Sequence, residues 1–255
     1  MDTALNHQTI LITGAAGRIG SAIARDLLDE GAKLILSDIN ESGLSKLQKE
    51  LSSDLVCCVP ANITSEASIK ELLACSLRYS NRIDSVVHSA YPHSTTWGCT
   101  IENLDESSLN EDLSMQLGSA ILISKIFIKH FQESGGGNLI HVSSIQGVSA
   151  PKFDHYEGTQ MHSPIEYAAI KAGVVSITRW LAKYYANQNI RVNCISPGGI
   201  FDDQPHAFLN AYRKTCTNYG MLAPQQIAGS VSFLLSPNSA AINGHNLIID
   251  DGWTL

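Results

Sequence analysis

Residues 9–31 read TILITGAAGRIGSAIARDLLDEG, and this stretch decides the fold. Ile10, Leu11 and Ile12 form a short continuous apolar run, which is typical of a strand buried on both faces of a sheet. Beyond the glycines, apolar residues recur at helical spacing until Gly31, a residue that commonly ends a helix. The stretch therefore predicts a strand, a glycine-rich turn and a helix.

The turn contains three glycines, each with a physical use at a dinucleotide site. Gly14 permits the tight turn, Gly17 lets the backbone approach a pyrophosphate, and Gly20 lets the helix pack closely on the strand. The free N–H groups at the start of the helix can then bind phosphate oxygens. A plain strand–turn–helix would carry the same glycines, so this interpretation depends on the rest of the chain.

The second expected strand, residues 33–37, is followed by an acidic residue. Asp38 lies 24 residues after Gly14, near the spacing of about 20 expected for a carboxylate that binds ribose hydroxyls. Such a carboxylate would repel a 2′-phosphate, which predicts NAD rather than NADP. Asp38 could instead cap the following helix. Arg18 is the basic residue nearby that would favour NADP, and we expect Asp38 to outweigh it.

The remaining pattern alternates strands with helices and contains no hairpin signal. It predicts an α/β fold: a single domain over residues 1–255 with a Rossmann-like, doubly wound parallel sheet of about seven strands and helices on both faces. Loops at about 146–166 and 201–222 are expected to bind substrate. Further strands are expected at 55–59, 83–87, 139–142, 190–195 and 245–249, and helices at 41–51, 65–79, 106–133, 167–187 and 224–235.

Polar residues follow several of these strands. Ligands bind outside the carboxyl ends of the strands in such sheets, and Asp38, Asn62 and residues 88–91 all fall there. Asn62 could hydrogen-bond an adenine amino group, or it could be a turn residue. The agreement of three strand ends with the glycine turn supports a dinucleotide site.

Composition excludes several classes of protein. Of the 255 residues, 44% are hydrophobic and 16% are charged, which is typical of a globular protein. The net charge of −7 argues against a nucleic-acid-binding surface. No apolar run approaches the roughly 20 residues of a membrane span, and residues 1–8 lack a signal-peptide hydrophobic segment. The cysteines and histidines show no metal-ligand spacing. We expect a reduced, cytoplasmic protein with no disulfide, metal site, nucleic-acid partner or membrane partner.

Four pieces of sequence, in this order, resemble the short-chain dehydrogenase/reductase family over essentially the whole chain. They are TGAAGRIG at 13–20, Ser144, YAAIK at 167–171 and NCISPGGI at 193–200. The resemblance implies hydride transfer between a nicotinamide and a carbinol or carbonyl carbon. The Ala90–Tyr91–Pro92 turn and the long loop are similar to the branch associated with flagellin modification and surface-sugar biosynthesis.

Tyr167 and Lys171 lie four residues apart, so they share one helical face. A nearby ammonium, together with a positive nicotinamide ring, favours the phenolate of a tyrosine whose ordinary pKa is about 10. The resemblance implies that Tyr167 exchanges a proton with the substrate oxygen, that Ser144 hydrogen-bonds this oxygen, and that Lys171 also holds the nicotinamide ribose. Tyr156 lies closer to the usual distance from Ser144, but Gln160, four residues beyond it, cannot supply the charge.

Two positions depart from the family pattern. His88–Ser89–Ala90–Tyr91 stands where the family has N-N-A-G, and we interpret His88 as a structural histidine. Gln116 stands where an asparagine often completes a proton relay; because it keeps the amide, we count it with the catalytic residues Ser144, Tyr167 and Lys171.

The resemblance also implies the cofactor contacts and the assembly. Polar residues Asp202, Asp203 and His206 favour a sugar-like substrate over a steroid. The two long helices are expected to form a homodimer or homotetramer, and the apolar C-terminal Trp253–Thr254–Leu255 could pack across such an interface. The expected NAD contacts are Gly14, Ala16, Gly17, Arg18, Ile19, Gly20, Asp38, Ile39, Asn62, Ile63, Ser89, Ala90, Tyr167, Lys171, Pro197, Gly198 and Ile200.

Two functions remain open from the sequence. The first is an NAD-dependent oxidoreductase that interconverts an alcohol and a ketone on a polar small molecule, such as a sugar or a nucleotide-sugar. The second is an NAD-binding protein with little catalysis that acts as a sensor or partner, which the altered His88–Ser89 and Gln116 suggest. The intact set of Ser144, Tyr167 and Lys171 favours the enzyme.

Overall fold

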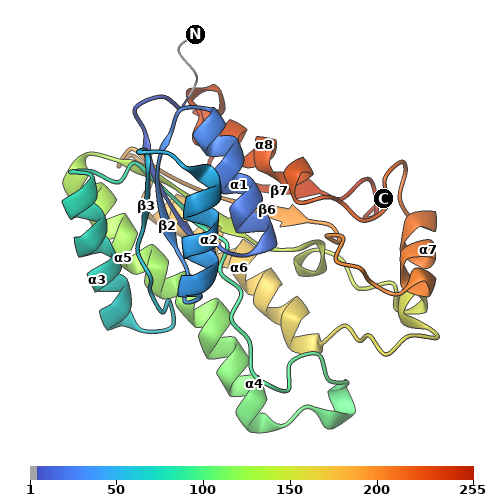
Figure 1. The fold of residues 1–255 in the computed structure, drawn as a ribbon. Helices are drawn as coiled ribbons and strands as arrows, with labels where there is room; N and C mark the ends of the chain where they lie inside the picture. The colour runs from blue at the N-terminus through green and yellow to red at the C-terminus, as the bar shows by residue number, and fades with distance from the viewer. Residues whose placement is uncertain (1–4) are drawn as a thin grey trace.

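The computed structural model describes residues 5–255 and contains one seven-stranded sheet. The strand order is β3-β2-β1-β4-β5-β6-β7, and every neighbouring pair is parallel (Figure 1). The predicted doubly wound parallel sheet is thus confirmed. The strands are β1 (Thr9–Thr13), β2 (Lys33–Ser37), β3 (Val56–Cys58), β4 (Ser85–His88), β5 (Gly137–Val142), β6 (Ile190–Pro197) and β7 (Asn246–Ile249).

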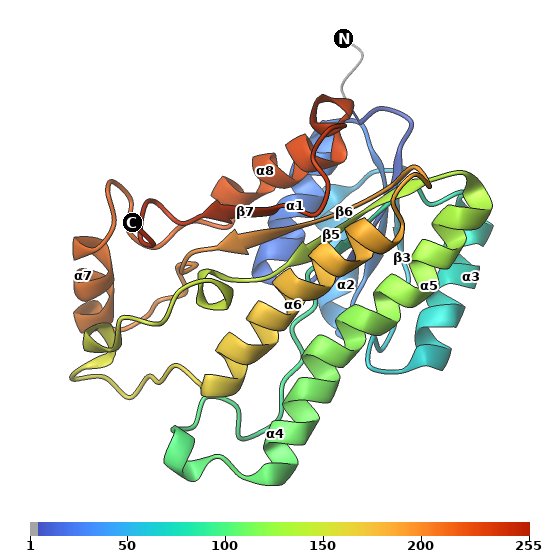
Figure 2. The ribbon, with the colours of Figure 1, turned by 180° about the vertical axis from the view of Figure 1, so that it is seen from behind.

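Helices cover both faces of the sheet (Figure 2). One face carries α1, α2 and α8, and the other carries α3, α5 and α6. The helices are α1 (Arg18–Asp29), α2 (Glu41–Leu51), α3 (Glu66–Tyr79), α4 (Glu106–Asp112), α5 (Ser119–Ser134), α6 (Ile165–Tyr184), α7 (His206–Lys214) and α8 (Gln225–Leu235). None of the helices within residues 5–255 has both the length and the apolar character that crossing a bilayer requires.

The apolar run in β1 explains why this strand is central. Ile10, Leu11 and Ile12 are all fully buried. Side chains alternate across a strand, so Ile10 and Ile12 join the apolar cluster under α1 and α8, whereas Leu11 joins the cluster under α3 and α5. A strand with a core on each face needs a continuous apolar run rather than an alternating one.

Two expected segments differ from the structure. The segment 201–222, expected to be a polar loop, contains α7, because Phe208 and Tyr212 are four residues apart and are both buried on one face of that helix. The helix expected over 106–133 is interrupted by a π-helical turn, Leu113–Gly118, between α4 and α5. Such turns occur most often at functional sites.

The C-terminal segment packs within its own chain. Trp253 is only 3% exposed, and its carbonyl oxygen accepts a hydrogen bond of 2.8 Å from Lys152 Nζ. Of the C-terminal residues expected at a subunit interface, Trp253 is thus buried within its own chain, whereas Leu255 is 98% exposed. Asp251 stabilises the loop that contains residues 218–220, because its carboxylate accepts hydrogen bonds from the backbone N–H groups of Asn218 and Gly220.

Two buried histidines face each other across β4 and β5. His88 and His141 are partners in the strand register, with ring centroids 5.8 Å apart. His88 Nδ1 lies 2.8 Å from Thr13 Oγ1, and His141 Nε2 lies 3.1 Å from Ser124 Oγ. Burial lowers the pKa of both rings, that of His141 to about 4. His88 therefore fits the structural interpretation of this residue.

We expect this histidine pair to make the fold less stable in acid. Between pH 6.5 and 4 these two histidines bind protons in the unfolded chain but stay neutral in the folded protein. The free energy of unfolding therefore falls as the pH falls. The free energy of unfolding from urea denaturation at pH 7 and pH 5 should differ by about 2 kcal/mol on account of the His141 ring, and His88 acts in the same direction. His141→Gln should reduce this difference, whereas His206→Gln, at an exposed site, should not. Equal pH dependence in all three proteins would contradict the prediction.

Candidate active site

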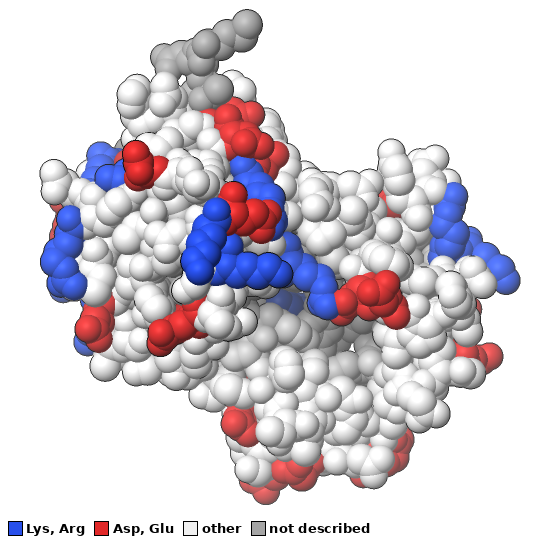
Figure 3. Space-filling view, in the orientation of Figure 1, with Lys and Arg blue, Asp and Glu red and all other residues white. Residues whose placement is uncertain are grey.

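A cavity of about 540 Å³ lies at the carboxyl ends of the central strands. The space-filling view shows this face hollowed between the α1–α2 side and α7, with basic and acidic side chains along the upper rim (Figure 3). Most of the expected cofactor contacts line this cavity: Gly14, Gly17, Arg18, Ile19, Gly20, Asp38, Ile39, Asn62, Ile63, Ser89, Ala90, Tyr167, Lys171 and Ile200.

A second cavity of about 280 Å³ adjoins the first. Pro197 and Gly198, expected at the cofactor, line this second cavity and not the first. Its wall includes the rings of Tyr156, Phe208, Tyr212 and Trp253. Tyr167 lines both cavities, so the two spaces meet at its side chain.

The glycine turn after β1 packs closely against the backbone that follows β4. Gly14 has a φ of +68°, and a Cβ there would lie 2.6 Å from the backbone N and Cα of Ala90. Gly17 is the N-cap of α1, so the N–H groups of the first helical turn have no partner within the helix. A narrow backbone cradle next to unpaired N–H groups fits the diphosphate of a dinucleotide.

Asp38 lies on the wall of the same cavity, at the end of β2. Its Oδ2 accepts a 3.0 Å hydrogen bond from the Ala16 N–H, and its Oδ1 accepts one of 3.0 Å from the Asn40 N–H. Asn40, whose side chain accepts from the Gly43 N–H, is the N-cap of α2. The alternative that Asp38 caps this helix is therefore wrong. Ala16 itself lines neither cavity and acts through this backbone bond.

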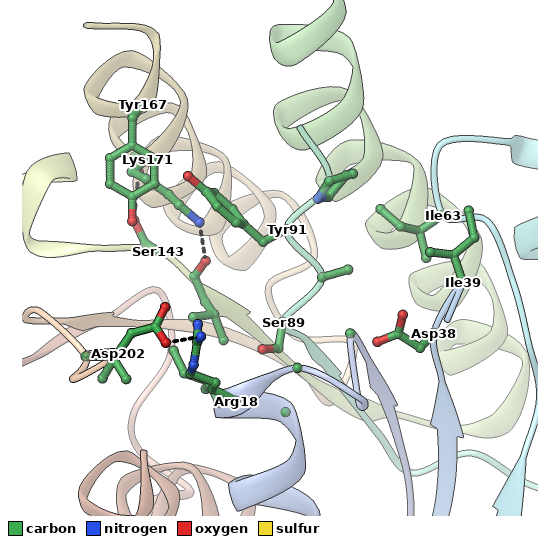
Figure 4. A pocket seen from close by; sticks show the side chains of 18 of the residues that line it. Arg18, Asp38, Ile39, Ile63, Ser89, Tyr91, Ser143, Tyr167, Lys171 and Asp202 are labelled. Atoms are coloured by element: carbon green, nitrogen blue, oxygen red, sulfur yellow. Dashed lines mark hydrogen bonds and ion pairs between the residues drawn. The ribbon is translucent and has the colours of Figure 1, made fainter. Parts of the chain in front are cut away.

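Arg18 and Asn62 take roles that limit what they offer a ligand. Arg18 points away from Asp38 and forms an ion pair with Asp202 on the other side of the cavity (Figure 4). Asn62 Oδ1 accepts hydrogen bonds from the Thr64 N–H at 3.0 Å and the Thr64 hydroxyl at 2.8 Å. Asn62 thus makes the contacts of a turn residue and also lines the first cavity, and its expected contact with adenine stays a prediction.

Tyr167 and Lys171 occupy the first two turns of α6, which is fastened to the end of β5. Lys171 Nζ donates to the Val142 carbonyl oxygen at 3.1 Å, and Ser143 Oγ donates to the Lys171 carbonyl oxygen at 2.8 Å. A Cβ at Gly147 would lie 2.7 Å from the Lys171 carbonyl carbon. The helix start is thus held at a fixed distance from the segment that carries Ser144.

Burial raises the pKa of Tyr167, and the nearby Ser144 hydroxyl lowers it in part. Burial also lowers the pKa of Lys171, to about 8. A phenol and an ammonium that both lose hydration beside a cavity are poised to respond to any charge that enters it.

The structure places the other predicted residues less centrally. Gln116 lies on the π-helical turn, lines neither cavity, and has no hydrogen-bond partner for either amide atom within residues 5–255. His155 lines the second cavity, whereas His162 does not. Asp202 lines the first cavity, but Asp203 and His206 are exposed away from both.

Two aromatic rings near the site, those of Tyr91 and Trp97, have no role predicted from the sequence. Tyr91 and Trp97 both contact the Tyr167 ring, with centroids 5.8 Å and 5.9 Å away. The sequence signal that could have indicated them is the presence of two aromatic residues shortly after the end of β4. The aromatic wall of the second cavity draws on residues between 156 and 253, a combination that no local pattern reveals.

The chain is similar to known oxidoreductases over almost its full length. A family described as enoyl-(acyl carrier protein) reductase matches residues 14–254. Post-translational flagellin modification protein A from Campylobacter coli is 41% identical, covering 98% of this chain and 100% of that protein. The 7alpha-hydroxysteroid dehydrogenase of Bacteroides fragilis is 29% identical, covering 98% and 95%.

A solved structure agrees with these matches. The short chain dehydrogenase from Leptospira borgpetersenii, determined with bound NAD+, superposes with a TM-score of 0.89 at 31% identity and covers 99% of this chain and 94% of its own. The sheet order, the glycine turn and the full-length matches lead to one conclusion. The chain belongs to the short-chain dehydrogenase/reductase family of enzymes.

Proposed function

We propose that this protein is an NAD-dependent oxidoreductase that interconverts an alcohol and a ketone on a polar, hydroxylated small molecule, such as a sugar or a nucleotide-sugar. The observation that carries the proposal is the position of Tyr167 where the two cavities meet, with Ser144 and Lys171 beside it. A dinucleotide would occupy the larger cavity and the substrate the smaller one.

The three side chains divide the work of moving one proton. When bound, the cofactor supplies or accepts the hydride. Ser144 hydrogen-bonds the substrate oxygen and orients it toward Tyr167. Tyr167 takes the carbinol proton during oxidation and returns it during reduction. Lys171, whose Nζ lies 5.5 Å from the Tyr167 ring centroid, stabilises the phenolate, and its N–H groups not used by Val142 are available to a ribose hydroxyl.

The second cavity supports a polar substrate. Gln146, Lys152 and His155 line it beside the aromatic wall, and no carboxylate is among its lining side chains within residues 5–255. An aromatic face suits the apolar face of a sugar ring, while polar groups can bind its hydroxyls. The similarity to a flagellin modification protein points in the same direction.

The alternative is a protein that binds NAD but has little catalysis. Its support is Gln116, whose buried amide has no hydrogen-bond partner within residues 5–255 and which lines neither cavity. A Tyr167 substitution separates the two functions.

We expect Tyr167→Phe to abolish turnover and to preserve cofactor binding. Loss of the group that transfers the proton should lower kcat by about 10²- to 10⁴-fold, measured as NADH absorbance with a panel of polyols, sugars, sugar phosphates and lipophilic alcohols. NADH fluorescence titration should give an unchanged Kd. Tyr219→Phe is the matched control, because Tyr219 is exposed and lines neither cavity. Unchanged turnover in Tyr167→Phe would refute the mechanism, and turnover of lipophilic alcohols alone would refute the polar substrate.

Asp38 should decide between the two cofactors. Removing a carboxylate that accepts charged hydrogen bonds costs about 1.5–3 kcal/mol, so Asp38→Asn should weaken NADH binding about 10-fold or more and improve NADPH binding. Fluorescence titrations with each cofactor measure both changes. Asp203→Asn, an exposed carboxylate outside both cavities, should change neither. Preference of the unaltered protein for NADPH would contradict the assignment.

We also propose that copies of the chain associate through α5 and α6. Ile121 on α5 and Trp180 and Tyr184 on α6 are exposed, and the last two rings stack with centroids 4.6 Å apart. Large apolar side chains in one exposed region are typical of protein–protein contacts.

Trp180→Glu should therefore lower the molar mass measured by light scattering coupled to size exclusion, because it places a charge in the centre of this contact. Tyr219→Glu changes an equally exposed aromatic residue on another part of the surface and should leave the mass unchanged. A monomeric unaltered protein would rule out the contact.

A further inference from the structure

The loop that follows β4 carries three aromatic residues, Tyr91, His93 and Trp97, which we name the aromatic loop. The Tyr91 and Trp97 rings meet edge to face, with centroids 5.6 Å apart and an interplanar angle of 85°. His93 stacks on Trp97 at 6.1 Å and also contacts Tyr91 at 6.0 Å. The three rings therefore form one cluster rather than three separate side chains.

A buried carboxylate fixes this loop to α4. Asp112 is 1% exposed, and its Oδ1 accepts a 2.6 Å hydrogen bond from the Ser94 N–H. Its Oδ2 accepts a 2.8 Å bond from the Ser94 hydroxyl. A buried carboxylate requires such partners, so Ser94 is held firmly between His93 and Trp97.

The cluster contacts both side chains to which the reaction is assigned. The Tyr167 ring meets Tyr91 at an interplanar angle of 83° and Trp97 at 80°. The Lys171 Nζ lies 5.1 Å from the centroid of the Tyr91 ring. Figure 4 shows Tyr91 beside Lys171 and Tyr167 on one side of the cavity, with Asp38 at the other end.

Lys171 needs stabilisation from its surroundings, because it is only 7% exposed. The titratable groups that face it are Tyr167 from α6, Tyr91 from the aromatic loop, His88 from β4 and His141 from β5. Burial lowers the pKa of both histidines and raises that of Tyr91. None of the four carries a negative charge near neutral pH. The ammonium is therefore stabilised by the Val142 carbonyl oxygen and by the rings of Tyr167 and Tyr91, of which the Tyr91 ring lies closer.

We propose that Tyr91 is a positioning residue, whose ring holds Lys171 as an ammonium and, together with Trp97, fixes the ring of Tyr167. The proposal rests on the roles proposed above for Tyr167 and Lys171. A charged Lys171 in a fixed position favours the phenolate that accepts the substrate proton. Tyr91 thereby acts through its neighbours and needs no contact with the substrate.

The titration of Lys171 tests this directly and requires no substrate. The protein is labelled with ¹³Cε-lysine, the Lys171 signal is assigned by its loss in Lys171→Met, and its shift is followed against pH by NMR. Tyr91→Leu keeps an apolar side chain but removes the π face, so the midpoint should fall by about 0.5–1 pH unit. Tyr91→Phe is the matched control; it keeps the ring and should leave the midpoint unchanged.

Other results would overturn the proposal. An unchanged midpoint in Tyr91→Leu would mean that the ring does not act on Lys171. A raised midpoint would mean that Tyr91 acts by excluding water, and an equal fall in Tyr91→Phe would assign the effect to the hydroxyl. Tyr91→Met repeats the test with a second side chain that has no ring. Because the titration does not depend on turnover, its failure is distinct from a failure of the oxidoreductase assignment, which Tyr167→Phe tests.

Discussion

The contact on which the site depends joins the turn after β1 to the chain after β4. Gly14 lies so close to Ala90 that any Cβ would overlap the backbone there. The two strands are neighbours because the sheet order reverses between β1 and β4, and this reversal opens the space in which ligands of such sheets bind. One glycine therefore holds the phosphate turn in place and, through Ala90, sets where the aromatic loop begins.

The second constraint is the burial of two ionisable groups side by side. Lys171 is held to the end of β5 by hydrogen bonds with Val142 and Ser143. Burial disfavours the charged form of each side chain, because it raises the pKa of Tyr167 and lowers that of Lys171 to about 8. Tyr167 is therefore a neutral phenol near neutral pH. Positive charge beside it is needed to bring its pKa toward the working pH, where proton transfer is most efficient.

Local signals in the sequence were sufficient for the sheet and for the main residues of the site. The apolar run at 10–12, the glycine turn and the acid after β2 each depend on neighbours in the chain, and they predicted the parallel sheet and the placement of Asp38. The π-helical turn at 113–118 was not predicted. Helix α7 was not predicted either, because Phe208 and Tyr212 are buried by partners such as His155 and Trp253 that lie far away in the sequence. The ion pair between Arg18 and Asp202 was not predicted either, because the two residues lie far apart in the sequence.

The aromatic loop shows how one short segment can contact both the phosphate turn and Lys171. Backbone at Ala90 packs against Gly14, and the very next side chain, Tyr91, reaches the Lys171 ammonium. A displacement of this segment would therefore change the phosphate turn and the charge of Lys171 together. Because Asp112 holds Ser94 through two hydrogen bonds, the segment is fixed at both ends, by Gly14 at its start and by α4 beyond Tyr91. The position of the Tyr91 ring beside Tyr167 and Lys171 thus depends on a buried carboxylate that lies outside both cavities.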